Sequence, residues 1–279
     1  MVAHVHTPSD LGGTMSGPVV KINKDLELDG ALVLVCFPSV GMVSSIVAHY
    51  FIDNLDLKFV GGVVDERLPS ICLVKDGAPM PAIRIYAGEP VCRVDDCDKL
   101  VIIMTELVIA PNLAHGIAEA MLEWSKASNA VMGVLIDAFA QGGGPAMNGQ
   151  SPVVDYEDTD AIDLLGIGST AAMRERLEAM EVPLLQHGVI NGVSAALLSE
   201  ARRRRLEVMS LLVEAETRFP DARAAAELIK VLDHLLPIMD LDESPLIEEA
   251  EELEAQIKAM METQVTPEPS PSSNPMLYG

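Results

Sequence analysis

Two loops and two titratable side chains are the places where this sequence could do chemistry on a small molecule. The loop 38–42 contains Gly41 and separates an apolar run from a helical pattern, so helix amides could hold a phosphate there. The loop 141–150 (QGGGPAMNGQ) contains three consecutive glycines, and Glu106 and His115 are the candidate acid and base. An enzyme of this kind would bind its substrate at the carboxyl ends of parallel strands.

Neither loop carries a nucleotide-binding pattern. The residues PSVGM match neither GxGxxG nor GxxxxGK[ST], and the loop has no lysine. The chain also shows no Ser-His-Asp order, no HExxH motif and no pair of carboxylates at a spacing typical of catalysis. A compact turn therefore explains the glycine better than a nucleotide site does, and we predict no catalytic residue and no cofactor.

The loop 38–42 lies inside a unit that predicts the fold class. Residues 31–37 (ALVLVCF) are an uninterrupted apolar run, as expected for a strand covered on both faces. Pro38 ends this strand, and apolar residues then recur at helical spacing from Met42 to Tyr50. A strand, loop and helix of this kind needs a right-handed crossover to another strand, which predicts an α/β protein.

Further apolar runs extend this unit into a sheet. Residues 100–104 and 131–139 are predicted strands separated by a helix over 112–127, which favours parallel order with the strand at 31–37. We expect a strand over 19–28 to form a hairpin with 31–37 through the turn Asp29-Gly30. The runs 57–64, ICLV and AIRIYA, with turn residues between them, predict an antiparallel meander at one edge.

The second half of the chain continues the alternation of helices and strands. We predict helices over 169–180 and from Asn191-Gly192 to Arg205, strands over 184–190 and 208–213, and a helix capped by Asp221 and stopped by Pro237. The basic block 202–205 is better explained by the dipole of a helix C-terminus than by a ligand clamp. The predicted class is a three-layer α/β/α fold with a mixed, largely parallel sheet.

Composition excludes several classes of function. The 279-residue chain is 49% hydrophobic, enough to bury a large core, and its formal charge is -23. A strongly acidic chain lacks the basic footprint that phosphate backbones need, so we predict no nucleic-acid partner. No apolar stretch is long enough to span a membrane and no signal-peptide pattern is present, which predicts a soluble cytoplasmic protein with no membrane partner.

The cysteines and histidines give no metal signature. The cysteines lie in or beside apolar runs without a CxxC pair and are predicted to be buried reduced thiols: Cys36, Cys72, Cys92 and Cys97. Three histidines beside apolar runs are interpreted as core residues: His49, His187 and His234. We therefore predict no metal site.

Four segments are predicted along the chain. Residues 1–17 are expected to be disordered, 18–240 to form the α/β/α domain, 241–263 an amphipathic helix, and 264–279 a flexible tail. The amphipathic helix (LIEEAEELEAQIKAMME) has a narrow apolar stripe, which could be a seam between subunits or could dock on its own domain. The tail ends in Met276, Leu277, Tyr278 and Gly279, an apolar and aromatic group beside a free carboxylate that suits capture by a pocket.

Four stretches together resemble the proteasome assembly chaperone family, in its archaeal branch. They are FPSVGMV, LPSICLV with GAPMPAIRIYAG, HGVINGVSAALLSEA, and LLVEAETRFPDARAAAELIKVLDHLL. The resemblance covers about residues 19–256 and implies a fold similar to nucleoside phosphorylases and peptidyl hydrolases without their chemistry. It also implies a homo-oligomer that binds the α-ring of the proteasome core particle through a hydrophobic-Tyr-X tail.

The same resemblance assigns roles to the last three residues. Leu277 would be the hydrophobic anchor, Tyr278 the key aromatic residue, and the carboxylate of Gly279 the partner of a pocket lysine between two α subunits. Two alternatives remain open. One is a nucleoside phosphorylase-like or other small-molecule enzyme that uses the strand-end loops, and the other is an ATP-independent holdase that uses some of the 15 methionines.

Overall fold

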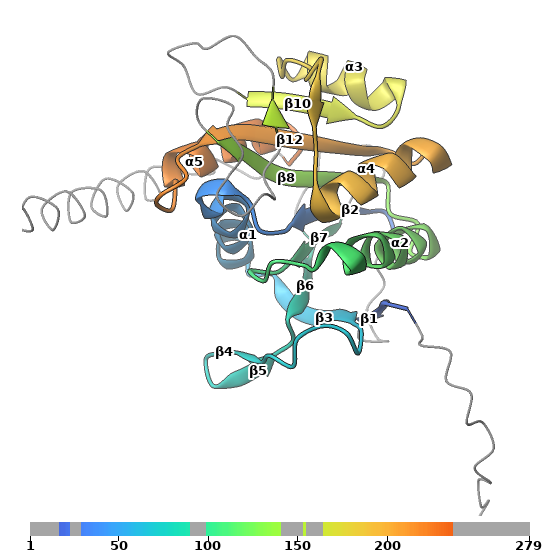
Figure 1. Cartoon of the computed structure of the whole chain (residues 1–279), viewed down its shortest axis with the longest axis vertical. Coiled ribbons are helices and arrows are strands. Elements are labelled where there is room, and N and C mark those ends of the chain that lie inside the picture. The colour runs from blue at the N-terminus through green and yellow to red at the C-terminus, as the bar shows by residue number, and fades with distance from the viewer. Residues whose placement is uncertain (1–16, 23–28, 90–98, 141–152, 155–163, 237–279) are drawn as a thin grey trace, which may run out of the picture.

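The computed structural model describes residues 17–22, 29–89, 99–140, 153–154 and 164–236. Its centre is an eight-stranded sheet with helices on both faces (Figure 1). From one edge to the other the strands are β1 (Val19–Ile22), β3 (Lys58–Val64), β6 (Ile83–Gly88), β7 (Lys99–Met104), β2 (Ala31–Cys36), β8 (Met132–Ala140), β12 (Val208–Ala215) and β10 (Leu164–Gly168). The described helices are α1 (Val43–Asn54), α2 (Pro111–Ala127), α3 (Ala171–Ala179), α4 (Gly192–Arg204) and α5 (Ala222–Asp233), with a 3-10 turn, η1 (Val40–Met42), before α1.

The centre of the sheet is parallel. β2 pairs in parallel with β7 on one edge and with β8 on the other, and β8 pairs in parallel with β12, which confirms the predicted parallel order of the core strands. The pairings on both sides of this centre are antiparallel: β1 with β3, β3 with β6, β6 with β7, and β10 with β12. The α/β class with a mixed sheet is confirmed, although the sheet is less parallel than predicted.

Side chains of β2 point alternately to two apolar cores, one on each face of the sheet. Leu32, Leu34 and Cys36 pack in a cluster with residues of α1, α3 and α5. Val33 and Val35 pack in a second cluster with residues of α2 and α4. Every residue of β2 is buried, which explains why the strand is a continuous apolar run in the sequence. The helices packed on the two faces of the sheet confirm the predicted three layers.

The predicted hairpin between the first strand and β2 is wrong. β1 pairs with β3 at the edge of the sheet, because both edges of β2 are already taken by β7 and β8. The turn at Asp29-Gly30 is present and is held from another loop, since the Gly30 N–H donates to the Asn129 carbonyl at 3.1 Å. The Asn129 side chain also donates to Asp29 Oδ1 at 2.7 Å.

The predicted meander is correct for β3 and β6 and wrong for the segment between them. ICLV does not join the main sheet; β4 (Leu73–Lys75) and β5 (Ala78–Met80) form a separate hairpin that projects from it (Figure 1). Asp76 and Gly77 both have positive φ, of 52° and 77°, as a two-residue hairpin turn requires. Cys72, beside this hairpin, is exposed, whereas Cys36 is buried as predicted and Cys92 and Cys97 lie outside the described residues.

Two features of the second half also differ from prediction. The run 184–190 is not a strand of the main sheet. Leu184 makes one bridge to Gly166, and among the described residues β11 (Gly188–Val189) pairs with β9 (Val153–Val154) alone. The edge strand is instead β10, where a Cβ on Gly166 would lie 2.8 Å from Leu177 Cδ2, so glycine lets α3 pack closely. The predicted cap of α5 is confirmed, since Asp221 Oδ1 accepts from the Ala224 N–H at 2.9 Å.

Candidate functional site

The loop 38–42 is stabilised from within by two serines. The Ser39 side chain accepts from the Ser44 N–H at 3.0 Å and from the Ser44 hydroxyl at 2.7 Å. The Ser44 hydroxyl also contacts the Phe37 carbonyl. Gly41 and Met42 both have positive φ, of 58° and 52°, which makes the turn tight. An amide that a phosphate would need, that of Ser44, is therefore already bonded to Ser39.

The space beside Gly41 is filled by the start of α5. A Cβ on Gly41 would lie 2.9 Å from Asp221 Cβ and 3.0 Å from the Glu216 carbonyl oxygen. The Asp221 N–H donates to the Gly41 carbonyl at 2.8 Å, and the Asp221 carboxylate accepts from the Glu216 N–H at 2.9 Å. Glycine is required here for close approach of two loops, and the neighbouring carboxylate would repel a phosphate. These contacts support the compact turn over a nucleotide site.

Glu106 lies at the end of β7 and is held by two partners. It pairs with Arg84 of β6 and with His49 of α1, whose Nε2 lies 3.3 Å from Glu106 Oε1. Burial raises the pKa of Glu106, but hydrogen bonds with His49 and Arg84 and the charge of Arg84 outweigh it and lower the pKa to about 2. Glu106 is thus an ionised carboxylate that fixes α1 and β6 to the β7 end, and proton transfer by it at neutral pH is unfavourable.

His115, the other candidate, is not brought to Glu106. It is an exposed residue of α2, and no hydrogen bond joins the two side chains in the described part of the chain. The interpretation of three histidines as core residues is wrong, because His187 and His234 are exposed and the His49 side chain is 43% exposed. The loop 141–150 lies outside the described residues.

Asp137, which sequence reasoning missed, is a buried carboxyl in the C-terminal half of β8, three residues before the strand ends at Ala140. It accepts from the Ala138 N–H at 2.9 Å and from the Ser194 hydroxyl in the first turn of α4. Burial raises its pKa to about 6, against the lowering effect of these two bonds. The signal in the sequence was an acidic residue inside the apolar run VLIDAF. An ionised Asp137 lies where the dipole of α4 favours a negative charge.

The pocket beside Asp137 is small. Phe37, Pro38 and Ile109 line it together with the start of α4, and its volume is about 30 Å³. This volume accommodates one or two water molecules. The described residues at these strand ends therefore do not form a space for a nucleoside.

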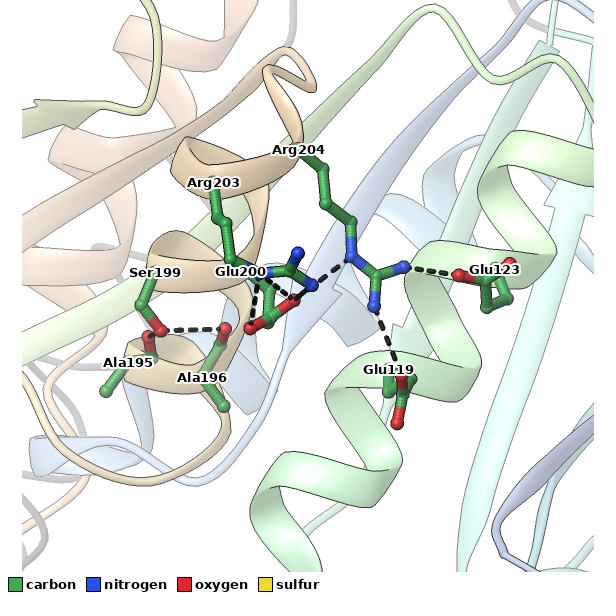
Figure 2. Close-up of polar contacts among 8 residues, drawn as sticks. All are labelled: Glu119, Glu123, Ala195, Ala196, Ser199, Glu200, Arg203 and Arg204. Carbon is green, nitrogen blue, oxygen red and sulfur yellow. Dashed lines mark hydrogen bonds and ion pairs between the residues drawn. The ribbon is translucent and has the colours of Figure 1, made fainter.

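The basic block 202–205 is used inside the protein. Arg204 lies between α4 and α2 and contacts three carboxylates: Glu200 at 3.0 Å, Glu119 at 3.2 Å, and Glu123 (Figure 2). Arg203 pairs with Glu200, and Arg202 donates to the Ser169 carbonyl at 3.1 Å. These contacts favour the structural explanation of the block over a ligand clamp.

A second pocket lies between the C-terminal half of α2 and the middle of α4, and we call it the α2–α4 pocket. Its floor includes Val33, Gly133 and Val208, and Leu122 of α2 and Leu197 of α4 form parts of its walls. Its volume is about 80 Å³. The pocket is mainly apolar, and it is the larger of the two pockets considered in the described residues.

Comparison with known proteins decides the family. The model of the PAC2 family matches residues 33–261, most of the chain. The protein belongs to the PAC2 family. Within the part of this PAC2 protein that the structure describes, no helix is both long and apolar enough to cross a bilayer.

Several solved structures share the fold of this PAC2 protein. PbaA of Pyrococcus furiosus, described as an archaeal homolog of proteasome-assembly chaperone, is 28% identical with a TM-score of 0.72, over 89% of this chain and 93% of PbaA. PbaB of the same organism, described as an archaeal proteasome activator, has a TM-score of 0.71 over 88% of this chain and 100% of PbaB, but at 16% identity it shows the fold alone. An uncharacterized protein of Methanocaldococcus jannaschii is 25% identical over 85% of this chain and 88% of its own length. These findings confirm the resemblance drawn from the sequence.

The predicted partner-binding residues of the PAC2 protein, Leu277, Tyr278 and Gly279, lie outside the described residues. So do the predicted amphipathic helix 241–263 and the tail 264–279. The α-ring contact and the oligomer therefore stay predictions.

Proposed function

We propose that this PAC2 protein is a proteasome assembly chaperone homologue, or a related proteasome-binding factor, that docks on the α-ring of the core particle through its C-terminal tail. The observation that carries the proposal is the similarity to PbaA, at 28% identity over 89% of the chain. The fold shared with PbaB, a proteasome activator, is consistent with it. The ending Leu277-Tyr278-Gly279 supplies the chemistry of the contact.

The tail combines three modest interactions. The Leu277 side chain and the Tyr278 ring each bury apolar surface, and the Tyr278 hydroxyl donates one hydrogen bond. The terminal carboxylate of Gly279 forms a charge-assisted hydrogen bond with a lysine of the partner. A group of this size binds weakly by itself, because few atoms are buried against the entropy lost on association.

Several tails on one homo-oligomer overcome this weakness. The segment 264–275 is rich in proline and serine, and a spacer of about a dozen residues has a root-mean-square reach on the order of 20 Å. Once one tail is bound, the others are held near their own pockets at high effective concentration. The protein then binds a ring of repeated pockets far more tightly than a single tail does.

The described strand ends favour this binding role over catalysis. Glu106 is ionised and paired, the pocket beside Asp137 accommodates only one or two water molecules, and Ser39 occupies the amide that a phosphate would need. The titratable carboxyl of Asp137 lies beside a pocket of only about 30 Å³, so the described strand ends offer no cavity in which a nucleoside could meet it. The domain is then best regarded as a rigid support for the tail.

Cosedimentation with purified archaeal proteasome core particles tests the proposal. The full chain should sediment with the particles, whereas a chain ending at Thr263 should remain in the supernatant. An aggregation-suppression assay on the same truncated chain serves as a control for the holdase alternative, since a holdase would retain activity without the tail. Cosedimentation of the truncated chain at the level of the full chain would contradict tail docking.

A further inference from the structure

The α2–α4 pocket exists because a glycine lies in the floor of the sheet. Gly133 of β8 leaves space above the sheet where another residue would place a side chain, and a Cβ there would lie 3.3 Å from Val208 Cγ2. Val33 of β2 completes the floor, and Leu122 and Leu197 close the sides. The result is an apolar cavity of about 80 Å³ at the amino ends of β8 and β12.

The two helices on either side of this pocket are joined by an ion-pair contact. Arg204 of α4 contacts Glu119 and Glu123 of α2 (Figure 2). The Arg204 side chain is only 18% exposed, which limits its mobility. A cavity that is already open between two joined helices needs little rearrangement to accept a ligand, and this preorganisation favours binding.

The rim of the pocket carries polar groups of both signs. Lys126, in the last turn of α2, contributes an ammonium group and has no ion-pair partner among the described residues. Glu207, just before β12, contributes a carboxylate, and Ser125 a hydroxyl. A ligand that matches this rim has an apolar group for the cavity, an anionic group for Lys126 and a hydrogen-bond donor for Glu207.

The C-terminal tail of this chain has these three groups in consecutive residues. The cavity is about half the 150 Å³ of an apolar cavity known to bind benzene, so it suits one aliphatic side chain rather than a tyrosine ring. Leu277 provides the aliphatic group, the Tyr278 hydroxyl is a donor, and Gly279 bears the carboxylate. In an extended segment successive side chains point to opposite sides, so Tyr278 would lie at the rim when Leu277 is inside.

We propose that the tail of this chain docks in the α2–α4 pocket, with Leu277 in the cavity, the Gly279 carboxylate on Lys126 and the Tyr278 hydroxyl on Glu207. The inference rests on the proposed function of the tail and adds its regulation. Between Leu236, the last described residue, and Leu277 the sequence predicts a helix over 241–263, about 34 Å long, and then a flexible segment with a reach on the order of 20 Å, which together are long enough to pass around a domain of this size. The docked tail is not available to the proteasome, so the pocket and the α-ring compete for the same three residues.

Methyl NMR on the full chain tests the docking directly. Leu277→Asp places a charge in the cavity and should expel the tail. The loss of the tail should then shift the methyl signals of the pocket residues Val33, Leu122, Leu197 and Val208. Lys126→Glu, at an exposed position, should produce the same shifts by repelling the carboxylate. Lys21→Glu, an exposed lysine of β1 away from the pocket, is the matched control and should leave these signals in place.

Binding to core particles supplies the second readout. Lys126→Glu should lower the apparent Kd by about three- to tenfold, because the apparent Kd is the intrinsic Kd divided by the undocked fraction. Lys21→Glu makes the same change of charge and should leave the apparent Kd unchanged.

The two proposals fail in different ways. Identical pocket methyl signals in the wild type and Leu277→Asp would overturn the docking, even if Leu277→Asp abolished binding to core particles. Conversely, shifted signals together with equal binding of all variants to core particles would leave the docking in place and overturn the proposed function of the tail.

Discussion

Asp137 shows what a single buried carboxyl does to the pH dependence of stability. Its folded-state pKa is about 6, above the usual value of 3.8, so the protonated form is favoured by folding. Its contribution to stability is present below the unfolded pKa and is lost as the pH rises through the folded pKa. The folded-state pKa of Asp137 lies about 2 above the usual value, so at pH 7.5 its ionisation lowers the unfolding free energy by on the order of 2 to 3 kcal/mol.

Asp137→Asn should therefore flatten the dependence of unfolding free energy on pH between about 4 and 6.5. At pH 7.5 we expect the variant to be more stable than the wild type by about 1 to 2 kcal/mol, because the amide keeps an acceptor for Ser194 but loses the favourable dipole of α4. Urea titrations at several pH values measure this. A wild-type to variant difference that does not change with pH would contradict the assigned role of Asp137.

Gly41 gives a second test at the scale of one residue. Gly41→Ala combines a positive φ of 58° with overlap against Asp221 and the Glu216 carbonyl, and should lower the unfolding free energy by about 2 to 4 kcal/mol. Gly77→Ala is the matched control, because its φ is 77° with nothing within 4 Å of the added Cβ. Gly77→Ala should lower the unfolding free energy by only about 1 kcal/mol. Equal losses in the two variants would show that close approach to Asp221 is unimportant.

Between α4 and α2, Arg204 makes an ion-pair contact with carboxylates of both helices. It joins α4 to two carboxylates of α2 with a side chain that is 18% exposed, while the Arg203 side chain is 66% exposed and pairs within its own helix. Exposed pairs contribute little because water and salt screen them, and partly buried networks contribute more.

Arg204→Ala should accordingly lower the unfolding free energy by about 1 kcal/mol, and Arg203→Ala by less. Thermal or urea unfolding of the two variants measures the difference. In 1 M salt the effect of Arg204→Ala should shrink, since the Debye length falls to about 3 Å. A larger loss for Arg203→Ala would contradict the bridging role of Arg204.

The elements that the sequence predicts well are those whose burial is uniform. The run 31–37 is apolar at every position because β2 is covered on both faces and paired on both edges, so its strand is evident without any tertiary information. β10 escaped prediction, and the predicted strand ICLV was assigned to the wrong sheet, because these strands lie at the edge of the main sheet or outside it. There, a glycine such as Gly166 is selected by packing against Leu177, which local sequence does not reveal.

The polar clusters could not be predicted for a related reason. Glu106 meets His49 and Arg84 across 57 and 22 positions, and only the strand order brings them together. Asp137 meets Ser194 because α4 begins beside the C-terminal half of β8. The candidate tail residues, by contrast, stand out in the sequence because an apolar and aromatic group follows a proline-rich spacer, and their roles, which the family resemblance implies, stay predictions.

For the whole molecule, the proposal depends on self-association. Avidity requires several tails on one particle, and the apolar stripe of the predicted helix 241–263 is our candidate seam between subunits. Static light scattering at micromolar concentration should give a mass that is a multiple of the monomer mass. Leu253→Glu, in the middle of the stripe, should reduce it, whereas Glu251→Lys, an acidic position of the same predicted helix, should not. A monomeric mass for the wild type would remove the basis of the avidity argument.

Net charge acts at the same scale. At a formal charge of -23 the protein repels other acidic surfaces, so binding to a ring of pockets has to depend on local contacts such as the tail carboxylate with a lysine. Raising the salt concentration should slow association with the core particle only if the α-ring surface around the tail-binding pockets is basic.

Surface plasmon resonance with immobilised core particles tests whether the last residues of the chain bind the proteasome. The wild type, Tyr278→Ala and a chain extended by one residue beyond Gly279 are compared at equal oligomer concentration. We predict near-complete loss of binding for both variants, because a loss of roughly 1 to 3 kcal/mol per tail is multiplied across the oligomer, and because the extension moves the carboxylate away from its lysine. Equal binding by all three proteins would contradict the claim and assign the contact to the folded domain.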